Sequence, residues 1–485
     1  MATPRKSTAS KKEATPRQAA PPKQFVYALE GEPESLDFTQ ATSLRSERVS
    51  WLLCDTLVDT SPTGKVKPTG LAKIRSLSPS GMVYEFTLID GVRFHDGTPL
   101  DAQAVIDNIQ RQLSPGRTPS VKGSILAGLI RKITRNSNLA FELELSYPSL
   151  HYLSEVHLVS PTALKSRGPA FGRNPVGSGP FIFKRWTPGT EIVLTANKDY
   201  WGGPPKLGKV VFRIIPDEAA RVQALIKGKA DFVPAVSDPE LLALLKKTPG
   251  VTLLPTPGWN LFYLGFYCDR PPFDAAAARR AVARAITTAD VVATRGLLIA
   301  KRTNRLLPAK ACKYQPAIPQ AGDRAPLPAG PLGLVFNQAV PLIAKEAAAI
   351  QRDLASIGTQ VRLLGKPSFP EVLTAVRARE GHMFIYNWHV SAVGPERVLK
   401  PLFHSDLKGI SNLTHYSNPD VDRKLADAAL DPALYPAILA ILDAEAPVVP
   451  LHDFKRRAAM SNRVLGLALK SLSSPADKLL KVRVR

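Results

Sequence analysis

The chain has 485 residues, of which 44% are hydrophobic and 22% are charged, and this composition is ordinary for a soluble protein. A chain of this length is too long to fold around a single hydrophobic core, so we expect two to four domains. The longest apolar runs, such as residues 447–451, are far shorter than the roughly 20 residues of a membrane-spanning helix. We therefore predict no transmembrane helix.

The formal net charge of +23 is large. A basic surface can attract nucleic acid, anionic lipid or an acidic ligand. It can also be an ordinary solvated coat, and the spread of Lys and Arg along the whole chain favours that interpretation. We expect no nucleic-acid partner.

Residues 1–24 contain six basic residues and one acidic residue, and they lack aromatic side chains. Such a segment cannot bury enough apolar surface to offset chain entropy, so we predict that residues 1–23 form a disordered basic tail. The tail is either a linker or a segment held near phosphates or lipid headgroups. A secretory signal needs an apolar stretch of about 7 to 15 residues after a basic start, and none is visible here.

Structured sequence begins at residues 24–29, which predict a short strand, and the string GEPESLDF then ends it. Residues 46–53 have helical spacing. Residues 84–110 are the most informative stretch. Apolar and polar residues alternate over 84–88, as in a half-buried strand, and two Asp-Gly dipeptides then favour tight turns. Asp101 is a suitable N-cap for the helix that the following spacing predicts.

The rest of the chain continues this mixture of strands and helices. Residues 174–201, NPVGSGPFIFKRWTPGTEIVLTANKDYW, predict a bend at the glycines followed by two strands. WNLFYLGF, at 259–266, predicts an aromatic strand. A strand, a helix and a strand are predicted over residues 332–364, and Asn418 is placed to cap a helix that begins at Pro419.

Catalytic signals are absent from the sequence. It contains no G-x-S-x-G, H-E-x-x-H, Walker A or Gly-rich dinucleotide motif. No two of the eight histidines stand four residues apart, and the three cysteines are far from one another, which disfavours a zinc site. The hypothesis that the protein is a hydrolase or a metalloenzyme is supported only by scattered His and Ser residues. We predict no catalytic residue, no metal and no cofactor.

Together these strings resemble family 5 of the extracellular solute-binding proteins, the dipeptide-, oligopeptide- and nickel-binding components of ABC importers. The resemblance implies an α/β, bilobal fold like that of the type II periplasmic binding proteins of the large peptide-binding class, with a hinge between its lobes. We expect lobe I over residues 24–257, with an inserted subdomain at about 60–185. Lobe II is expected over residues 258–452, and residues 453–485 should return to lobe I.

The resemblance also implies a function. A chain of this family captures a peptide-like or other small solute between its lobes and delivers it to the membrane permease of an ABC transporter. We expect such a protein to be a monomer. A buried ligand needs polar groups for orientation and aromatic faces for contact area, so the candidate ligand-binding residues come from the matched motifs and from lobe II. These candidates are Glu34, Ser35, Trp259, Asn260, Tyr386, Trp388, His389 and Ser391.

One departure from the family concerns the ligand. Peptide-binding relatives carry W-x-x-D-x-x-D-P, in which an aspartate pairs with the free ammonium group of the peptide. After Trp388 this sequence has Ser391 and Gly394 at the two acidic positions. A desolvated ammonium would lack its partner, so peptides with a free amino group are doubtful ligands, and a neutral or anionic solute fits better unless Glu396 compensates.

A second departure concerns the compartment. Family members work in the periplasm or at the cell envelope, whereas this sequence shows no signal peptide. The alternative is therefore an intracellular ligand sensor or regulator built on the same fold. Relatives of that kind carry an N-terminal winged helix, which the short basic tail cannot supply.

Overall fold

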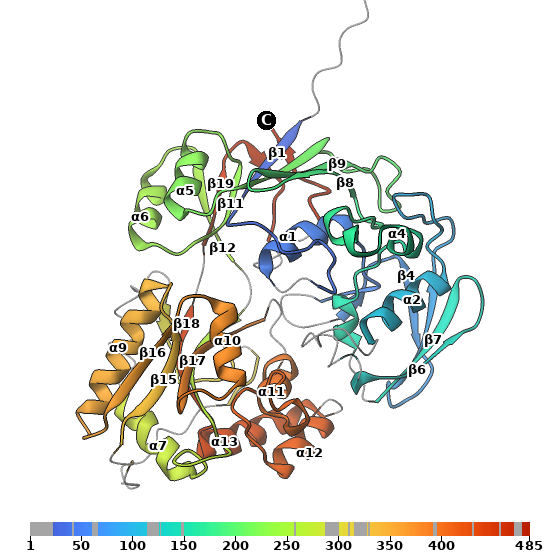
Figure 1. Cartoon of the computed structure of the whole chain (residues 1–485). Coiled ribbons are helices and arrows are strands. Elements are labelled where there is room, and N and C mark those ends of the chain that lie inside the picture. Colours follow the sequence, from blue (N-terminus) through green and yellow to red (C-terminus); the bar gives the residue numbers. More distant parts are fainter. Residues whose placement is uncertain are drawn as a thin grey trace, which may run out of the picture.

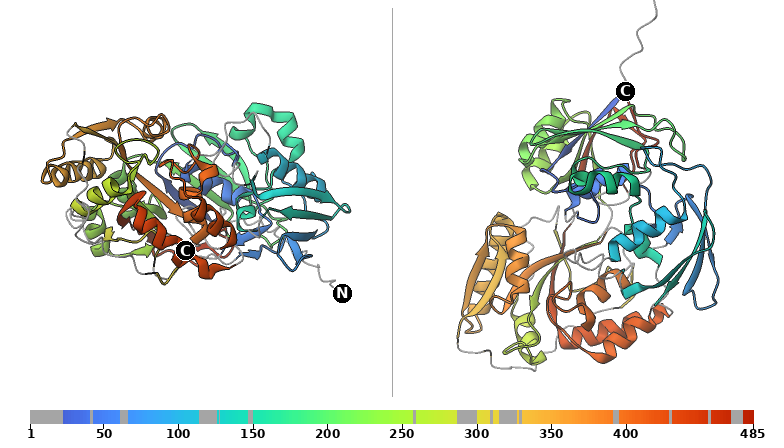
Figure 2. Two further views of the ribbon diagram at one scale, coloured as in Figure 1. Left: turned by 90° about the horizontal axis from the view of Figure 1, so that it is seen from below. Right: turned by 45° about the vertical axis from the view of Figure 1, so that its right-hand side comes forward.

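The computed structural model consists of two α/β lobes that lie side by side (Figure 1), and two further views show the same two bodies (Figure 2). It confirms the expected bilobal α/β class. No helix among the described residues has the length and apolarity that a membrane span requires. The structure describes residues 23–40, 43–60, 66–113, 126, 128–146, 150–256, 259–286, 300–308, 311–314, 327, 330–390, 395–428, 431–454, 457–469 and 478–485.

Lobe I contains a sheet of seven strands, with α5 and α6 covering one of its faces and α1 lying on the other. The strand order is β12 (Val251–Pro255), β19 (Arg457–Ser461), β11 (Phe232–Val236), β1 (Gln24–Leu29), β10 (Lys209–Ile214), β9 (Glu191–Ala196) and β8 (Phe181–Thr187). The helices are α1 (Leu44–Leu53), α5 (Glu218–Ile226) and α6 (Pro239–Lys247), and β20 (Val464–Leu465) pairs with β21 (Arg483–Val484) nearby.

A smaller sheet of four strands is attached to lobe I, in the order β4 (Ala72–Ser76), β5 (Val83–Leu88), β7 (Ala140–Leu145) and β6 (Ile130–Arg135). The accompanying elements are β2 (Val58–Thr60), β3 (Val66–Pro68), α2 (Ala102–Leu113), η1 (Leu150–Glu155), α4 (Pro161–Arg167) and η2 (Gly168–Arg173). The expected strand at 84–88 is present. The backbone N–H of Ala104 donates to Asp101 Oδ1 at 2.8 Å, which confirms the predicted N-cap.

Lobe II contains a sheet of six strands between two layers of helices. The strand order is β14 (Ala300–Arg302), β18 (Val448–Phe454), β13 (Trp259–Phe266), β17 (Met383–Val390), β15 (Leu332–Asn337) and β16 (Val361–Lys366). The helices are α7 (Ala276–Ala285) and α9 (Pro341–Ala355) on one face and α10 (Phe369–Arg377), α11 (Pro395–Phe403), α12 (Pro419–Asp427) and α13 (Tyr435–Glu445) on the other, with η3 (Ser405–Leu407) and η4 (Pro432–Leu434) between them.

Two crossings connect the sheets. Between Pro255 and Trp259 the chain passes from β12 in lobe I to β13 in lobe II, and between Phe454 and Arg457 it returns from β18 to β19. Strands β1, β10, β11 and β12 all run in one direction, so their carboxyl ends share the edge from which the chain leaves lobe I. Val390, at the carboxyl end of β17, pairs with Trp259, where the chain enters lobe II. The two sheets therefore turn the carboxyl ends of their parallel strands toward each other.

The glycine motif at 177–179 fastens the inserted part of lobe I to α1. The N–H of Gly179 donates to the carbonyl of Leu53 at 2.8 Å. A Cβ on Gly177 would lie only 2.0 Å from that same oxygen, so the close approach requires glycine. His95 completes the contact, because its Nε2 lies 2.9 Å from the carbonyl of Gly179 and its Nδ1 accepts from the N–H of Gly177.

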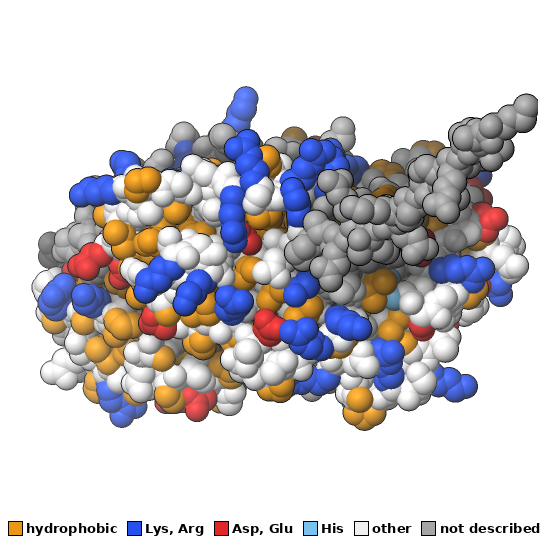
Figure 3. All heavy atoms as spheres, turned by 90° about the horizontal axis from the view of Figure 1, so that it is seen from above, with side chains coloured by type: hydrophobic (Ala, Val, Ile, Leu, Met, Phe, Trp, Pro, Cys, Tyr) orange, Lys and Arg blue, Asp and Glu red, His pale blue; other side chains and the backbone are white. Residues whose placement is uncertain are grey.

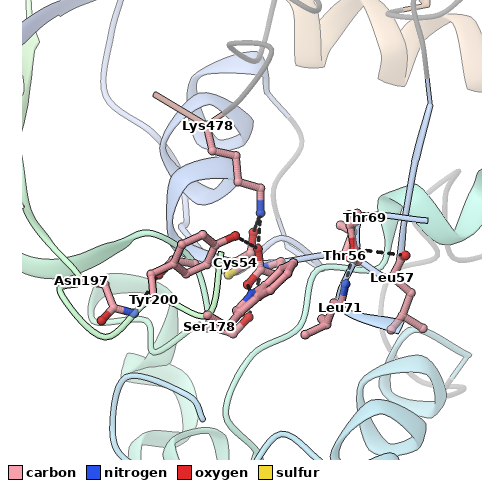
Figure 4. A network of polar contacts seen from close by, with 12 residues as sticks. Cys54, Thr56, Leu57, Thr69, Leu71, Ser178, Asn197, Tyr200 and Lys478 are labelled. Carbon is pink, nitrogen blue, oxygen red and sulfur yellow. Dashed lines mark hydrogen bonds and ion pairs between the residues drawn. The ribbon is translucent and has the colours of Figure 1, made fainter. Parts of the chain in front are cut away.

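Asp55 is a second fastening point, buried directly after α1. Its carboxylate accepts hydrogen bonds from the Tyr200 hydroxyl and the Trp201 indole, both at 2.9 Å, and from the Lys478 ammonium at 2.6 Å. Figure 4 shows Lys478 reaching toward Cys54 from the C-terminal segment, with Tyr200 beside it. Three distant stretches of sequence thus meet at one carboxylate, and this explains the Tyr-Trp pair of the 174–201 motif.

Candidate functional site

The region between the lobes is the candidate site. In open α/β sheets, ligands bind beyond the carboxyl ends of the strands, where loops can vary without disturbing the sheet. Here the loop after β1 in lobe I and the end of β17 in lobe II stand on the two carboxyl edges that face each other. The predicted ligand-binding residues that the structure describes come from this loop, from β17 or from the start of β13, and Ser391 lies outside the described residues.

The loop after β1 carries Glu34 and Ser35. The carboxylate of Glu34 accepts hydrogen bonds from the backbone N–H and the hydroxyl of Ser43, at 2.7 and 2.6 Å, so it holds the residue that caps α1. Ser35 is buried, and its hydroxyl accepts from the N–H of Asp37 at 3.1 Å. Both predicted residues therefore have structural contacts within lobe I, and these contacts stabilise the shape of the loop.

The same loop is further fixed by an ion pair that joins it to α2. Arg111 donates to both carboxylate oxygens of Asp37, one bond measuring 2.9 Å, and the aspartate is almost fully buried. Bidentate arginine–carboxylate pairs fix orientation as well as distance. The backbone N–H of Leu36 also donates to the carbonyl of Gly172 at 2.8 Å. A rigidly held loop is a suitable wall for a binding site.

On lobe II, Asn260 stands at the start of β13 and is 4% exposed. Its Oδ1 accepts a hydrogen bond from Nδ2 of Asn387 on β17, at 3.2 Å. The register pairs Asn260 with His389 and Trp259 with Val390, so these predicted residues share one end of the strand pair. The side chains of Trp259 and His389 lie outside the described part of the structure, as does Ser391.

Tyr386 and Trp388 lie on the other face of the same strand pair, because side chains alternate along a strand. The Tyr386 ring packs against Phe369 of α10, with ring centroids 5.4 Å apart, and burial raises the pKa of its hydroxyl. The Trp388 indole N–H donates to the carbonyl of Arg397 in α11 at 3.1 Å. The predicted set is therefore divided between two faces of one sheet, with Asn260 on the first and Tyr386 and Trp388 on the second.

Two residues that the sequence did not indicate connect the lobes directly. Nη2 of Arg397 in α11 lies 3.0 Å from Oε1 of Glu155, the last residue of η1 in lobe I. Their side chains are only 12% and 21% exposed. Since Trp388 binds the carbonyl of this same arginine, a predicted site residue supports the contact between lobes. No sequence signal could reveal a pair separated by 242 positions.

A buried polar pair lies under the central strands of lobe II. His452 of β18 places Nε2 2.8 Å from Oε1 of Glu346 in α9, and both side chains are fully buried. The ring of Phe262 stacks on the imidazole, with centroids 4.8 Å apart and planes inclined by 18°. A paired histidine in such a setting is held in place by its neighbours, which suits a structural role more than ligation of a metal.

Among the described residues, no group of three or more His, Cys, Asp or Glu side chains is arranged to hold a metal ion. All three cysteines are free thiols, and burial raises the pKa of Cys54 and of Cys268 to about 12, which keeps both thiols protonated. Near the site, burial lowers the pKa of Lys400 to about 8, against the opposing charges of Glu396 and Asp406.

The chain is similar in sequence to several proteins of known identity. The chain is 26% identical to heme-binding protein A of Haemophilus influenzae, over 82% of this chain and 80% of that protein. It is 26% identical to the peptide transport periplasmic protein SapA of Salmonella typhimurium, over 92% and 89%. It is also 26% identical to the glutathione-binding protein GsiB of Escherichia coli, over 92% and 91%.

Two solved structures share the fold. The periplasmic binding protein DppA of Helicobacter pylori, in complex with the peptide STSA, superposes with a TM-score of 0.81 at 23% identity, over 95% of this chain and 98% of that one. The binding protein AgaA of A. tumefacien R10, in complex with agropinic acid, also gives 0.81, at 22% identity, over 95% and 99%. A family model described as "Bacterial extracellular solute-binding proteins, family 5 Middle" matches residues 65–409, and the chain therefore belongs to this family.

Proposed function

We propose that the protein is the substrate-binding component of an ABC importer, which captures a small solute between its lobes and presents it to a membrane permease. The observation that carries this proposal is the arrangement of the two sheets, whose parallel strands end at facing edges and between which the chain crosses from β12 to β13 and from β18 to β19. Such a molecule can open and close about the crossings, and a ligand that contacts both lobes favours the closed form. The membership of the family supports the same function.

The ligand itself is proposed to lie across the end of the β13–β17 strand pair, where it would reach Trp259, Asn260 and Trp388 from beyond the sheet, and Ser391, which follows β17 in the sequence. Asn260 supplies an amide that is already held by Asn387, so little side-chain freedom is lost when it binds a solute. The indole N–H of Trp388 is used by Arg397, which leaves the face or edge of the ring for a ligand. Glu34 and Ser35 act as supports of the loop in lobe I.

The first experiment is identification of the solute that co-purifies with the protein, by mass spectrometry after denaturation. A thermal-shift screen of peptides, sugars and anionic metabolites would supply ligands if none co-purifies. Calorimetry with the best ligand on W259A, N260A, W388A and S391A then tests the site. N462A is a matched control for N260A, because Asn462 is exposed at the far end of lobe I. Unchanged affinity in all four site variants would reject this site.

The nature of the ligand can be tested at Ser391. Since the family's acidic position is a serine here, we expect N-acetylated peptides or anionic solutes to bind better than peptides with a free amino group. Ser391→Asp should improve binding of a free dipeptide relative to its N-acetyl form. Equal preference of the native chain and the variant would mean that this position does not select the ligand.

We further propose that the protein works as a monomer in the periplasm or at the cell envelope, has no catalytic activity and docks on the permease of its transporter. The curated relatives named above are binding or transport proteins by their names, and none is described as an intracellular sensor. Cell fractionation of the natural host tests the compartment. Recovery in the cytoplasmic fraction alone would favour the sensor alternative.

A further inference from the structure

The basic charge of lobe I is gathered at one end. The edge of the seven-stranded sheet where β1, β10, β11 and β12 begin, and where β9 and β19 end, is called here the amino edge. Gln24 pairs with Lys209 there, and Val251 pairs with Ser461. It is the edge opposite to the one that faces lobe II.

Six separate stretches of chain bring basic residues to the amino edge. Backbone hydrogen bonds connect several of these stretches. The N–H of Gly208 donates to the carbonyl of Lys23, and the N–H of Lys206 donates to the carbonyl of Leu480. The N–H of Arg485 donates to the carbonyl of Arg463. The basic residues of these stretches, apart from the inward-facing Lys478, are Lys23, Lys198, Lys206, Lys209, Lys227, Lys229, Lys246, Lys247, Arg463, Lys481, Arg483 and Arg485.

Few carboxylates balance them. The same stretches contain only Asp199 and Asp231, and Asp231 is buried and already paired with Arg463. Residues 1–22, which join the described chain at Lys23, add five basic residues and one acidic residue by sequence. Figure 3 looks onto this end of the molecule, and Lys and Arg side chains clearly outnumber Asp and Glu there.

The opposite edge of the same sheet has a different character. The turns that follow β1, β10 and β11 carry Glu30, Glu32, Glu34, Asp217, Glu218, Asp238 and Glu240. Arg48, Arg173 and Arg221 pair with three of these carboxylates, so this edge carries both signs, whereas the cations of the amino edge are mostly unbalanced. Basic residues that serve only to keep a protein surface hydrated do not need to gather at one end of a lobe. A field concentrated on one end orients the molecule toward an anionic surface.

We propose that the amino edge of lobe I binds the anionic phospholipid headgroups of a membrane surface and so holds the protein beside that membrane. Nine of its twelve basic residues are lysines, which act as hydrated point charges and suit a fluid layer of headgroups more than the bidentate contacts of a nucleic acid. The aromatic residues of the six stretches are Tyr200 and Trp201, and both donate to Asp55. Neither is presented as a stacking platform for bases.

This inference goes beyond the proposed capture of a solute, because the amino edge lies away from the facing edges of the two sheets. Membrane binding and solute capture should also differ in how strongly they depend on salt concentration. Attraction to headgroups falls off within a Debye length, so binding should be strong in dilute buffer and lost at about 0.5 M salt. Capture of a solute between the lobes should weaken much less with salt, because buried contacts are screened less than exposed ones.

The test is flotation of the full-length protein with vesicles of phosphatidylglycerol and phosphatidylcholine, compared with vesicles of phosphatidylcholine alone. The test variant replaces four exposed lysines of the amino edge by glutamine, namely K206Q, K227Q, K229Q and K481Q. At about fivefold per surface charge, the loss of four charges should lower the partition coefficient on anionic vesicles by roughly several hundredfold. The control variant removes four exposed basic residues of lobe II, namely K313Q, K345Q, R352Q and K408Q, and should lose less than about threefold.

Thermal unfolding of both variants verifies that they are folded, and calorimetry with the solute identified for the binding site should give unchanged affinity. Binding to neutral vesicles as strong as to anionic ones would overturn the proposal, and so would equal losses in the two variants. Tighter binding to a short DNA duplex than to anionic vesicles, at the same salt, would assign the amino edge to nucleic acid instead. Failure here leaves the solute-binding result unaffected, so the two proposals can fail separately.

Discussion

Arg397 of lobe II and Glu155 of lobe I form an ion pair across the two lobes, with a distance of 3.0 Å between Nη2 and Oε1. The two residues belong to elements on different sides of the crossings, α11 and η1, so any opening of the lobes at this point separates them. The pair therefore favours the arrangement seen here over a more open one. Its strength is limited because both side chains remain partly exposed.

Glu155→Gln should shift the protein toward open conformations. A partly exposed ion pair contributes about 1 kcal/mol, so the ratio of closed to open molecules should fall about fivefold. Small-angle scattering without ligand would show a larger radius of gyration. The control is Glu144→Gln, which removes a surface ion pair with Arg131 inside one sheet. Identical scattering of the two variants would mean that the Glu155 pair does not govern the hinge.

Asp55→Asn should destabilise lobe I, because the buried carboxylate binds Tyr200, Trp201 and Lys478 together. Removal of the charge leaves the Lys478 ammonium, which is mostly buried, without its counter-charge, although it still donates to the carbonyl of Cys54. We expect the free energy of unfolding to fall by about 3 kcal/mol, measured by urea denaturation. The exposed Asp199, from the same motif, is the matched control, and D199N should change it by less than about 0.5 kcal/mol.

Local structure could be read well from the sequence, because the signals are themselves local. Asp101 and Asn418 were predicted to cap helices, and both accept hydrogen bonds from the first-turn N–H groups, at 2.8 and 2.9 Å. The strand at residues 259–266 was predicted from its aromatic residues and has those bounds in the structure. Caps and alternation depend on neighbours within a few positions, which a sequence displays directly.

The site was less accessible to sequence reasoning. The sequence makes Asn260, Tyr386 and Trp388 candidates without showing which way they face. The period of two along β17 and its register with β13 place the asparagine on the opposite face from the two aromatic rings. Register is a tertiary property that depends on the partner strand. The Glu155–Arg397 pair depends on how two separate lobes meet, and nothing in either local sequence encodes that meeting.

Gly177→Ala tests whether the glycine motif is needed for close approach. The added Cβ would lie 2.0 Å from the carbonyl oxygen of Leu53 and 2.8 Å from the sulfur of Cys54, so α1 must move. We expect a loss of about 2–4 kcal/mol in the free energy of unfolding. Gly128→Ala is the matched control, because its Cβ would meet nothing within 4 Å. A variant G177A as stable as G128A would show that the backbone contact between the motif and α1 is adaptable.

His95 gives lobe I a sensitivity to acid. Burial lowers its pKa, only partly opposed by the hydrogen bond to Gly179 and by the charges of Asp55 and Asp96. The folded state therefore binds a proton less readily than the unfolded state, whose histidine titrates near pH 6.5. The contribution of His95 to stability is complete above about pH 6.5 and is lost as the pH falls from there toward the lowered pKa of the folded state.

His95→Gln removes this titration. At neutral pH the variant should be less stable by about 1–2 kcal/mol, because the bonds to the 177–179 backbone are weakened. Between about pH 6.5 and pH 5, however, it should lose less stability than the native chain, as measured by urea unfolding at each pH. His382 also has a lowered pKa, so H382Q is the comparison for a half-exposed histidine in lobe II. Parallel pH profiles for the native protein and H95Q would place the acid sensitivity elsewhere.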